Sequence, residues 1–572
     1  MEQGARRRIV QALEEAQRHH QGYLPPSVLR TLAAELGVPS YHLYGLATFF
    51  PHFRLEPPPV LDVRVCADMS CRLRGGTALL RELETAAATR PSNEVTVTTV
   101  SCLGRCDGAP AAAVNDQPYW GLADGLRTAL VCAVRESAPL PRPPSLTPLS
   151  GLRVDPYQPG DARFAALRRL VESGEAATVL ATLRAAQLRG MGGAGFSAAI
   201  KWEAVRNAPG DEKYVVCNAD ESEPGTIKDR GILTSVPHLV VEGMAVAGVL
   251  TGASRGIIYI RHEYGPEAEI LAQTLEMARR EGVLGEHVLG SSHAFDTEIF
   301  TSPGGYICGE ETALLEVIEG RRAQPRLKPP FPVTSGLYGK PTVINNVETL
   351  AHVPAILLKG AEWYLAQGRA GAPGMKFVGV SGHVRHPGVY EIALGTTLRE
   401  VIDRHAGGML DGHALKAVAP SGPSSGFLPA TLADTPVEWA ALQKAGSMLG
   451  SSAVVAIGEG TCMVDMALNV ARFFARESCG KCWPCRVGSE KIVQMLEAVT
   501  EGTAAEGGLA AIDDLAATLR LTSICGLGQV VPSPIVSVLR HFPDEVDAHL
   551  LDRRCPAGTC PMRPGSQIEG MR

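Results

Sequence analysis

The sequence predicts a multidomain α/β protein that ends in a helical region. Its 572 residues suffice for roughly three to five domains. Apolar runs typical of strands alternate with helical stretches over much of the chain, which is the pattern of α/β units. From Met463 to Leu496, and again from Leu509 to Leu519, the apolar spacing is helical.

Composition and charge exclude several classes of protein. Apolar residues make up 45% of the chain and charged residues 20%, an ordinary globular balance. The net charge is −6 and no long basic run occurs, so we expect no nucleic acid partner and no direct membrane insertion. The N-terminus lacks the apolar core of a secretory signal, and the most apolar stretch, 239–253, is interrupted by Glu242. We therefore predict a cytoplasmic protein, in which 14 cysteines indicate metal ligation rather than disulfides.

The first domain is expected over residues 1–137. Helical spacing covers 5–50, and an alternating strand then ends at Cys66. A helix and a second strand, which ends at Cys102, complete a compact α/β module behind a helical cap. Prolines are frequent over 138–160, and this composition indicates a stiff linker.

Four regions are expected after the linker. Apolar strands at 214–219 and 256–261, separated by helical stretches, predict a mainly parallel α/β domain. Short β runs around glycine and proline turns predict a small β-rich domain, and a helical domain and a tail follow it. The expected bounds are 161–370, 371–440, 441–546 and 547–572.

Two cysteines follow each of the two strands of the first module. The pairs are Cys66-x4-Cys71 and Cys102-x3-Cys106, which should meet at one edge of the sheet. Four thiolates from two loops suit a [2Fe–2S] cluster. Zinc and ordinary buried cysteines are the alternatives, although structural zinc usually has closer cysteine pairs.

A second cysteine set gives the strongest single indication of a metal cluster in the chain. It consists of Cys479-x2-Cys482-x2-Cys485 and a distant Cys525. Three thiolates on one turn and a remote fourth suit a [4Fe–4S] cluster, and without a metal such close thiols would be prone to oxidation. Zinc is the alternative metal.

The end of the chain holds a further candidate metal site. Cys555 and Cys560 follow His549, and Cys462 would complete a set of three thiolates and one imidazole for zinc. The alternative is a pair of ordinary surface thiols in a frayed tail.

A glycine-rich loop and acidic segments predict a nucleotide site. The loop 189–196 reads RGMGGAGF, and such glycines let main-chain N–H groups approach a phosphate or a flat ring. The usual dinucleotide fingerprint is incomplete, because 178–188 has helical rather than strand character. The acidic run 220–223 follows a buried strand, at the edge where α/β sheets bind ligands. A flexible turn and a solvated acidic loop are the alternatives.

Together these motifs resemble the NADH-binding flavoprotein subunit of respiratory complex I. The resemblance spans about residues 180–535 and is carried by RGMGGAGF, NADESEPGTIKDR, YICGEETALLEVIEG, RLKPPFP, INNVET and SCGKCWPC. Residues 1–135, with YLPPSVLRTLAAELGVP and YGLATFF, resemble the thioredoxin-like [2Fe–2S] subunit of the same complex. The diaphorase subunits of NAD-reducing hydrogenases and of NAD-dependent formate dehydrogenases are similar, and several of them fuse the two modules.

The resemblance implies the fold and the cofactor of each region. It implies a thioredoxin-like [2Fe–2S] module, a Rossmann-like domain for FMN and NADH, a small β-grasp-like insert and a helical [4Fe–4S] bundle. The family's FMN contacts correspond here to Gly190, Gly192, Gly193, Lys201, Asn218, Asp220, Tyr306, Gly309, Glu310, Asn345 and Asn346. Its NADH contacts correspond to Phe196, Glu223, Glu311, Lys328 and Phe331. Because FMN carries the hydride, no protein side chain is expected as a catalytic residue.

The function implied by the resemblance is that of an NADH:acceptor oxidoreductase, or diaphorase, subunit. NADH and FMN exchange a hydride, and iron–sulfur clusters pass single electrons to or from partner subunits. The expected partners are an iron–sulfur subunit and a catalytic subunit such as a formate dehydrogenase or a hydrogenase. The segments around Cys462, Cys525 and Cys555 also resemble flavin-based electron-bifurcating enzymes, which implies zinc at the C-terminal site. A bifurcating FMN subunit is therefore one alternative function. A non-catalytic iron–sulfur scaffold, which would need the cysteine sets but not the glycine loop, is another.

Overall fold

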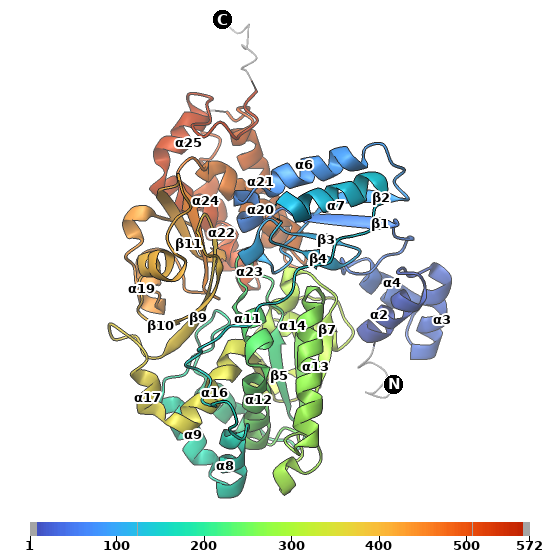
Figure 1. The fold of residues 1–572 in the computed structure, drawn as a ribbon, viewed down its shortest axis with the longest axis vertical. Coiled ribbons are helices and arrows are strands. Elements are labelled where there is room, and N and C mark those ends of the chain that lie inside the picture. The colour runs from blue at the N-terminus through green and yellow to red at the C-terminus, as the bar shows by residue number, and fades with distance from the viewer. Residues whose placement is uncertain (1–8, 123, 506, 564–572) are drawn as a thin grey trace, which may run out of the picture.

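The computed structural model describes residues 9–122, 124–505 and 507–563. They form a multidomain α/β structure (Figure 1) in which the first module lies beside the C-terminal helices. The central α/β domain packs beneath both in this view.

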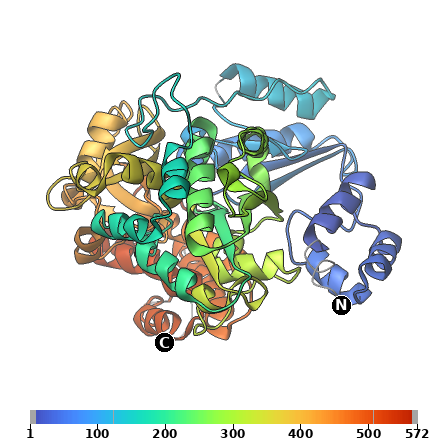
Figure 2. The ribbon, with the colours of Figure 1, turned by 90° about the horizontal axis from the view of Figure 1, so that it is seen from below.

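The first module consists of a helical cap and a four-stranded sheet. The cap is formed by α2 (Ile9–His19), α3 (Pro26–Leu36) and α4 (Ser40–Ala47), which lie to one side in Figure 2. The sheet has the order β2-β1-β3-β4, from β1 (Leu61–Cys66), β2 (Val95–Val100), β3 (Ala112–Val114) and β4 (Gln117–Tyr119). Its helices are α5 (Met69–Leu73), α6 (Gly76–Ala87) and α7 (Asp124–Glu136). Because β1 and β2 are parallel, the loops after them meet at one edge, as predicted.

The proline-rich linker is fixed to two other regions by carboxylates. The main-chain N–H groups of Arg153 and Val154 donate to Glu391, at 2.7 and 2.8 Å. Farther along, the hydroxyl of Tyr157 donates to Glu242 at 2.7 Å. The linker therefore holds its position without regular secondary structure.

A parallel sheet with the order β7-β6-β5-β8 forms the middle of the central domain. Its strands are β5 (Tyr214–Ala219), β6 (Arg255–Arg261), β7 (Asp296–Ser302) and β8 (Thr342–Asn346). Helices cover both faces, which explains the continuous apolar runs of β5, β6 and β8. The chain places β6 and β7 on one side of β5 and then returns to place β8 on the other. Such a reversal of strand order leaves a crevice at the carboxyl ends of the strands.

Ten α-helices surround this sheet among the described residues. They are α8 (Ala165–Ser173), α9 (Ala176–Ala185), α10 (Ala198–Asn207), α11 (Lys228–Ser235), α12 (Pro237–Thr251), α13 (Gly265–Arg280), α14 (Glu311–Ile318), α15 (Pro332–Ser335), α16 (Val347–Lys359) and α17 (Ala361–Leu365). Helix α9 precedes the glycine loop, so the loop is not entered from a strand, as the helical character of 178–188 predicts.

No single helix in the described part of the chain is long and apolar enough to cross a membrane. The pair α11 and α12 passes a test of length and composition but is bent by 95°. Nearly all of α12 is buried in the protein core. The predicted cytoplasmic location stays a prediction.

The small β-rich domain extends beyond its expected end at residue 440. Its sheet has the order β10-β9-β13-β11-β12 and is built from β9 (Met375–Gly382), β10 (Gly388–Ala393), β11 (Leu415–Pro423), β12 (Leu428–Pro429) and β13 (Ala453–Gly458). Strand β13 lies between β9 and β11, inside the region expected to be helical. A short apolar run such as AVVAIG does not distinguish a buried strand from a helix, and this is why the boundary at 440 is wrong.

The C-terminal region is mainly helical from Met463 to Leu550, and its helices cover most of the stretches 463–496 and 509–519 predicted from the apolar spacing. Its helices are α20 (Met463–Glu477), α21 (Trp483–Thr500), α22 (Ile512–Thr522), α23 (Gly526–Val530), α24 (Ser533–His541) and α25 (Pro543–Leu550). Helix α20 buries Met463, Ala467 and Phe474 on one face, which is the spacing of an amphipathic helix.

A buried ion pair joins the first module to the central domain. Arg105, next to Cys106, lies 2.6 Å from Glu267 of α13, and both side chains are completely buried. The Arg105 guanidinium also lies 5.5 Å from the ring centroid of Tyr264 in the central domain. These contacts fix the edge of the first sheet against the central domain.

Candidate functional site

A cavity of about 460 Å³ lies at the reversal of strand order between β5 and β8. Its lining includes many of the residues implied by the resemblance, namely Gly192, Gly193, Asn218, Asp220, Glu223, Tyr306, Gly309, Glu310 and Asn346. They come from the glycine loop, from the ends of β5 and β8, and from the turn before α14. The fold therefore brings these separate motifs to one crevice.

Glycine is required where the wall of this cavity is tightest. A Cβ atom on Gly309 would lie 2.8 Å from the carbonyl oxygen of Asp220. A Cβ atom on Gly192 would lie 3.0 Å from the Cβ atom of Asn346. Gly193 has a φ of +138°, which residues other than glycine rarely adopt. Bare backbone at these positions leaves room for a ligand to approach the main chain.

Asp220 offers unpartnered acceptors to the cavity. The residue is 8% exposed, and among the described residues neither carboxylate oxygen has a hydrogen-bond partner of good geometry. Burial raises its pKa to about 7, and nearby Arg261 opposes this shift. Buried acceptors normally have partners, so these oxygens fit the N–H or hydroxyl groups of a flavin. These acceptors and the glycine wall are thus suited to FMN.

Glu223 is held in place by residues from two other regions. Its carboxylate accepts hydrogen bonds from the hydroxyl of Tyr306 and, at 2.8 Å, from the main-chain N–H of Ser424. Burial raises its pKa to about 7, although the bond from Tyr306 acts in the opposite direction. The Tyr306 ring in turn packs edge-on against Phe473, with centroids 5.1 Å apart. This acidic group is therefore positioned before any nucleotide binds.

Buried charges behind the cavity orient Asn346. Its side-chain oxygen accepts from Lys228 at 3.0 Å, and its amide donates to Asp229. Lys228 also lies 3.0 Å from Glu348. Burial would raise the pKa of Glu348, but Lys376 and Lys228 outweigh it and hold that pKa low. The network fixes the cavity wall at the end of β8.

The remaining residues implied by the resemblance lie outside the lining of this cavity. They are Gly190, Phe196, Lys201, Glu311, Lys328, Phe331 and Asn345. Gly190 donates its N–H to the carbonyl of Phe196 at 2.8 Å and so closes the glycine loop. Asn345 accepts from the indole of Trp202 at 2.7 Å, which gives it a core contact.

Three of these outlying residues form a charged edge beside the cavity. Lys328 lies 2.7 Å from Glu311 and 3.1 Å from Glu310, and Lys201 lies 3.8 Å from Glu311. Burial would raise the pKa of Glu311, but the two lysines keep it below its usual value. Phe196 and Phe331 are 53% and 54% exposed, so both rings have faces available for stacking.

The four cysteines of the first module converge at the edge of its sheet. Cys66, Cys71, Cys102 and Cys106 are all buried, and the sulfurs of Cys102 and Cys106 are 3.3 Å apart. The main-chain N–H of Gly225 donates to the sulfur of Cys106 at 3.3 Å. Gly225 lies in the same loop as Asp220, so this cysteine set and the 460 Å³ cavity share a loop. Hydrogen bonds to sulfur are among the factors that set cluster potentials.

The second cysteine set lines one small cavity. Its members are Cys479, Cys482, Cys485 and Cys525. Cys482 directly precedes α21 and Cys485 lies in its first turn, where the positive end of the helix dipole favours thiolate charge. Ile307 and Leu527 line both this small cavity and the 460 Å³ cavity, so the two cavities share a wall.

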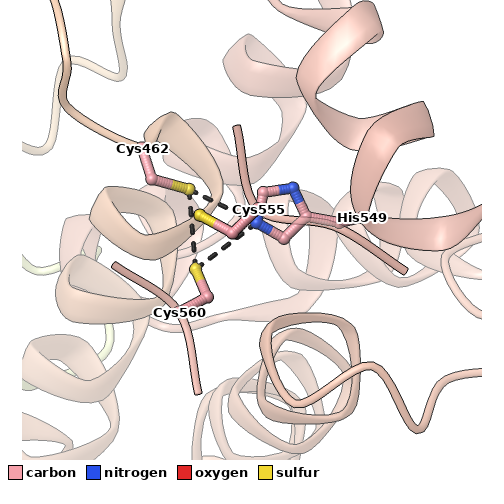
Figure 3. Close-up of side chains that lie close together, drawn as sticks. All are labelled: Cys462, His549, Cys555 and Cys560. Atoms are coloured by element: carbon pink, nitrogen blue, oxygen red, sulfur yellow. Dashed lines mark hydrogen bonds between the residues drawn. The ribbon is translucent and has the colours of Figure 1, made fainter. Parts of the chain in front are cut away.

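The C-terminal set also converges, as Figure 3 shows. The candidate ligand atoms of Cys462, His549, Cys555 and Cys560 all lie within 4.8 Å of one another. Nε2 of His549 lies 3.5 Å from the sulfur of Cys462 and 3.3 Å from that of Cys560. Its Nδ1 lies 2.7 Å from the carbonyl of Glu545, which assigns the proton to Nδ1 and leaves Nε2 free to bind a metal.

Known protein families match four regions of the chain. Residues 1–131 match the thioredoxin-like [2Fe-2S] ferredoxin family, and 183–355 match the Nuo51 FMN-binding domain. Residues 377–428 match the SLBB domain, and 465–549 match the NADH-ubiquinone oxidoreductase-F iron-sulfur binding region. The F 2 subunit of the NADH-quinone oxidoreductase of Rhizobium meliloti (strain 1021) is 44% identical over 400 residues, which are 70% of this chain and 95% of that protein. The chain belongs to the family of NADH-quinone oxidoreductase F subunits.

Other relatives of this F-type chain belong to hydrogenases. The NADP-reducing hydrogenase subunit HndC of Solidesulfovibrio fructosivorans is 42% identical over 384 residues, 67% of this chain and 78% of that protein. A solved structure of an NAD+-reducing [NiFe]-hydrogenase in the air-oxidized state matches with a TM-score of 0.84 and 32% identity. That match covers 94% of this chain and 93% of the other.

These matches confirm the predicted family, fold class and enzyme class. The F-type chain is an NADH-oxidising flavin and iron–sulfur protein with a fused thioredoxin-like domain. The matched domains imply FMN, one [4Fe–4S] cluster and one [2Fe–2S] cluster. They name no zinc.

Part of the flavin cavity was not predicted from the sequence. The missed lining residues that come from later parts of the chain include Ser421, Ser424, Met448, Gly450, Ser451, Gln529 and Val530. They belong to the SLBB region, to the segment before β13 and to the C-terminal helices. The run PSGPSSGF at 420–427 was an available signal, because loops rich in glycine and serine expose main-chain N–H groups.

Proposed function

We propose that this F-type protein is the diaphorase subunit of an NAD-linked hydrogenase. The agreement with the NAD+-reducing [NiFe]-hydrogenase chain carries the proposal, because it extends over 94% of this chain and so includes the thioredoxin-like module. An NAD-dependent formate dehydrogenase would use the same type of subunit with a different catalytic partner. Identification of the native partner separates the two.

Side chains around the cavity bind and orient the reactants in this proposal. FMN, when bound, links two-electron hydride exchange with NAD(H) to one-electron transfer. Asp220 and the main-chain groups of the glycine loop hold the flavin. Phe196 and Phe331 stack against the nucleotide, and Lys328 attracts its phosphates. Glu223 accepts a ribose hydroxyl.

Both cysteine sets adjoin the flavin cavity. Cys479, Cys482, Cys485 and Cys525 would hold the [4Fe–4S] cluster beyond the wall formed by Ile307 and Leu527. Cys66, Cys71, Cys102 and Cys106 would hold the [2Fe–2S] cluster beside the loop that carries Gly225. All members of the second set except Cys485 are partly exposed, whereas the first set is buried, and this difference supports electron exit to a partner subunit through the [4Fe–4S] side.

The C-terminal set is proposed to bind zinc. Three thiolates and one imidazole suit a tetrahedral zinc ion, and all four positions are filled by protein. No coordination site would remain for an activated water, so the role would be structural. The resemblance of these segments to bifurcating enzymes makes a bifurcating FMN subunit the second candidate function. Strict dependence of NADH oxidation on a second, low-potential acceptor such as ferredoxin would favour that candidate.

The proposal is tested on the natively purified protein. We expect about one FMN and, from one [4Fe–4S] and one [2Fe–2S] cluster, about six iron atoms per chain. Anaerobic NADH should bleach the flavin, and a hydrogenase subunit should copurify. A protein without flavin absorption would contradict the diaphorase function. Copurification with a formate dehydrogenase would instead show that the catalytic partner is a formate dehydrogenase and not a hydrogenase.

A further inference from the structure

Glu477 joins three parts of the redox site that are far apart in the chain. It is the last residue of α20, and its carboxylate accepts hydrogen bonds from the hydroxyl of Ser101 and, at 2.7 Å, from the N–H of Tyr306. Ser101 directly precedes Cys102, and Tyr306 lines the flavin cavity. Cys479 follows Glu477 by two residues. One carboxylate thus connects the segments that carry both cysteine sets and the cavity wall.

A carboxylate at this place is electrostatically unfavourable. The C-terminal end of a helix carries the negative end of the helix dipole, which repels an acidic side chain. The adjacent Arg476 does not neutralise Glu477, because its guanidinium pairs with Asp68 at 3.0 Å. A compensating benefit is expected for an acid at this position, and the two hydrogen bonds supply one.

Tyr306 is held from both ends and along its ring. Its N–H donates to Glu477, and its hydroxyl donates to Glu223. The ring packs against Phe473 and Phe474 of α20, with centroid distances of 5.1 and 6.4 Å. Loss of the bond to Glu477 would therefore release one end of a residue whose other end positions an acidic group of the cavity.

Other side chains of α20 contact the cysteine-bearing loop of the first module. Asp465 lies 2.7 Å from Arg72, and Asn469 donates to the carbonyl of Ala67 at 2.8 Å. These contacts hold α20 along the segment that carries Cys71. Glu477, at the C-terminal end of α20, adds a third contact to this series and connects the helix to the wall of the flavin cavity through Tyr306.

We propose that Glu477 is a positioning residue that keeps the two cluster-bearing segments and the flavin cavity in one mutual arrangement. The identity of the redox groups rests on the proposed function, whereas the hydrogen bonds belong to the folded chain itself. Electron transfer between redox groups slows steeply as they separate, so a small displacement of either segment lowers the internal transfer rate.

Amide hydrogen exchange tests this proposal directly. Glutamine at position 477 keeps an oxygen for the Tyr306 N–H and can donate its own amide to the Ser101 hydroxyl, whereas alanine removes both bonds. We expect the peptide that contains Tyr306 to exchange roughly tenfold faster or more in Glu477→Ala and to stay protected in Glu477→Gln. Glu490→Ala is the matched control, because Glu490 lines the same cleft as Glu477, Ser101 and Tyr306.

Transient kinetics provide the second readout. In the cofactor-loaded Glu477→Ala protein, reoxidation of the NADH-reduced flavin through the clusters should slow several-fold. Glu477→Gln should restore the wild-type rate. Ser101→Ala removes one of the two bonds and should have a smaller effect in the same direction, which keeps the test open if Glu477→Ala does not fold.

Two outcomes would overturn the proposal. One is unchanged exchange at Tyr306 in a folded Glu477→Ala protein. The other is a Glu477→Gln protein that behaves like Glu477→Ala, because charge rather than positioning would then explain the effect. A wild-type chain that binds no flavin would refute the proposed function instead, and the exchange measurement would still decide the role of Glu477.

Discussion

Glu223 is an acidic residue in an unusual environment for a charged group. The carboxylate is buried, its two oxygens are engaged by Tyr306 and Ser424, and its pKa is raised to about 7. Relatives of this chain include both an NAD+-reducing and an NADP-reducing enzyme. The choice between the two nucleotides therefore depends on local contacts, and Glu223 is the acidic group proposed to make that choice.

We expect Glu223→Gln to reduce the preference for NADH over NADPH roughly tenfold in kcat/KM. A carboxylate repels the 2′-phosphate of NADPH, whereas an amide does not. Because the pKa of Glu223 lies near 7, the wild-type preference should also shrink as the pH falls from about 8 to about 6 and the carboxylate is protonated. The Gln variant should show a flatter profile. Comparable turnover of both nucleotides by the wild type would contradict the assignment.

Substitution of Cys482 tests whether electrons leave the reduced flavin through the [4Fe–4S] cluster. Cys482→Ser should abolish most electron transfer to external acceptors, because a [4Fe–4S] cluster needs its thiolates. Provided that FMN stays bound, anaerobic NADH should still bleach the flavin in a single turnover. Cys132→Ser is the control, since Cys132 lies on α7 outside both cysteine sets. Full cluster signal and full acceptor activity in the Cys482 variant would refute its role as a ligand.

Helix α20 is the element that connects the candidate metal sites. Cys462 lies directly before its first residue, and its own C-terminal residue, Glu477, precedes Cys479 by two positions. At 1.5 Å per residue, this helix spans about 22 Å. Its contacts to Arg72 and Ala67 run along the loop that carries Cys71. A rigid helix thus sets the spacing between the C-terminal set and the two iron–sulfur sites.

The tail beyond α25 supplies Cys555 and Cys560 of the C-terminal set. Cys555→Ser combined with Cys560→Ser should remove about one zinc per chain and make the tail more sensitive to proteolysis, because only two ligands would remain. Metal analysis and limited proteolysis measure both effects. If metal analysis finds more iron than the two clusters account for, and no zinc, the site binds iron rather than zinc. If the double variant keeps its metal content and its resistance, these four residues are not a metal site.

The first module and the central domain of the molecule share a buried interface. The Arg105–Glu267 pair lies in this interface, beside the candidate ligand Cys106. The loop that contains Gly225 crosses the same interface to reach the sulfur of Cys106. The proposed [2Fe–2S] site therefore depends on the docking of two domains.

We expect Glu267→Ala to lower the free energy of unfolding by about 3 to 5 kcal/mol, because it leaves the Arg105 guanidinium buried without its partner. Glu269→Ala is the matched control on the exposed side of the same helix and should change stability little. Denaturant unfolding measures the difference, and limited proteolysis shows whether the first module detaches. Equal stability of the two variants would mean that the pair does not hold the interface.

The cysteine sets were predictable because their chemistry is visible in local spacing. Cys479, Cys482 and Cys485 stand close together in the chain, and the residues after β1 and β2 must meet once two parallel strands are recognised. The predicted strands at 214–219 and 256–261 agree with β5 and β6, because continuous burial on both faces demands continuous apolar sequence. Strand β13 was missed, because an apolar run of that length suits a helix equally well.

The amino-acid sequence alone was enough for the family, the α/β class, FMN and the two iron–sulfur clusters, since each depends on residues that are neighbours in the chain or on motifs recognised as a set. The folded structure was needed to show that Ser424 holds Glu223 and that Gly225 reaches Cys106. It also showed that Asn345 faces the core and that Glu477 bridges Ser101 and Tyr306. Strand order and domain docking, rather than spacing along the chain, determine which distant groups come within hydrogen-bond distance.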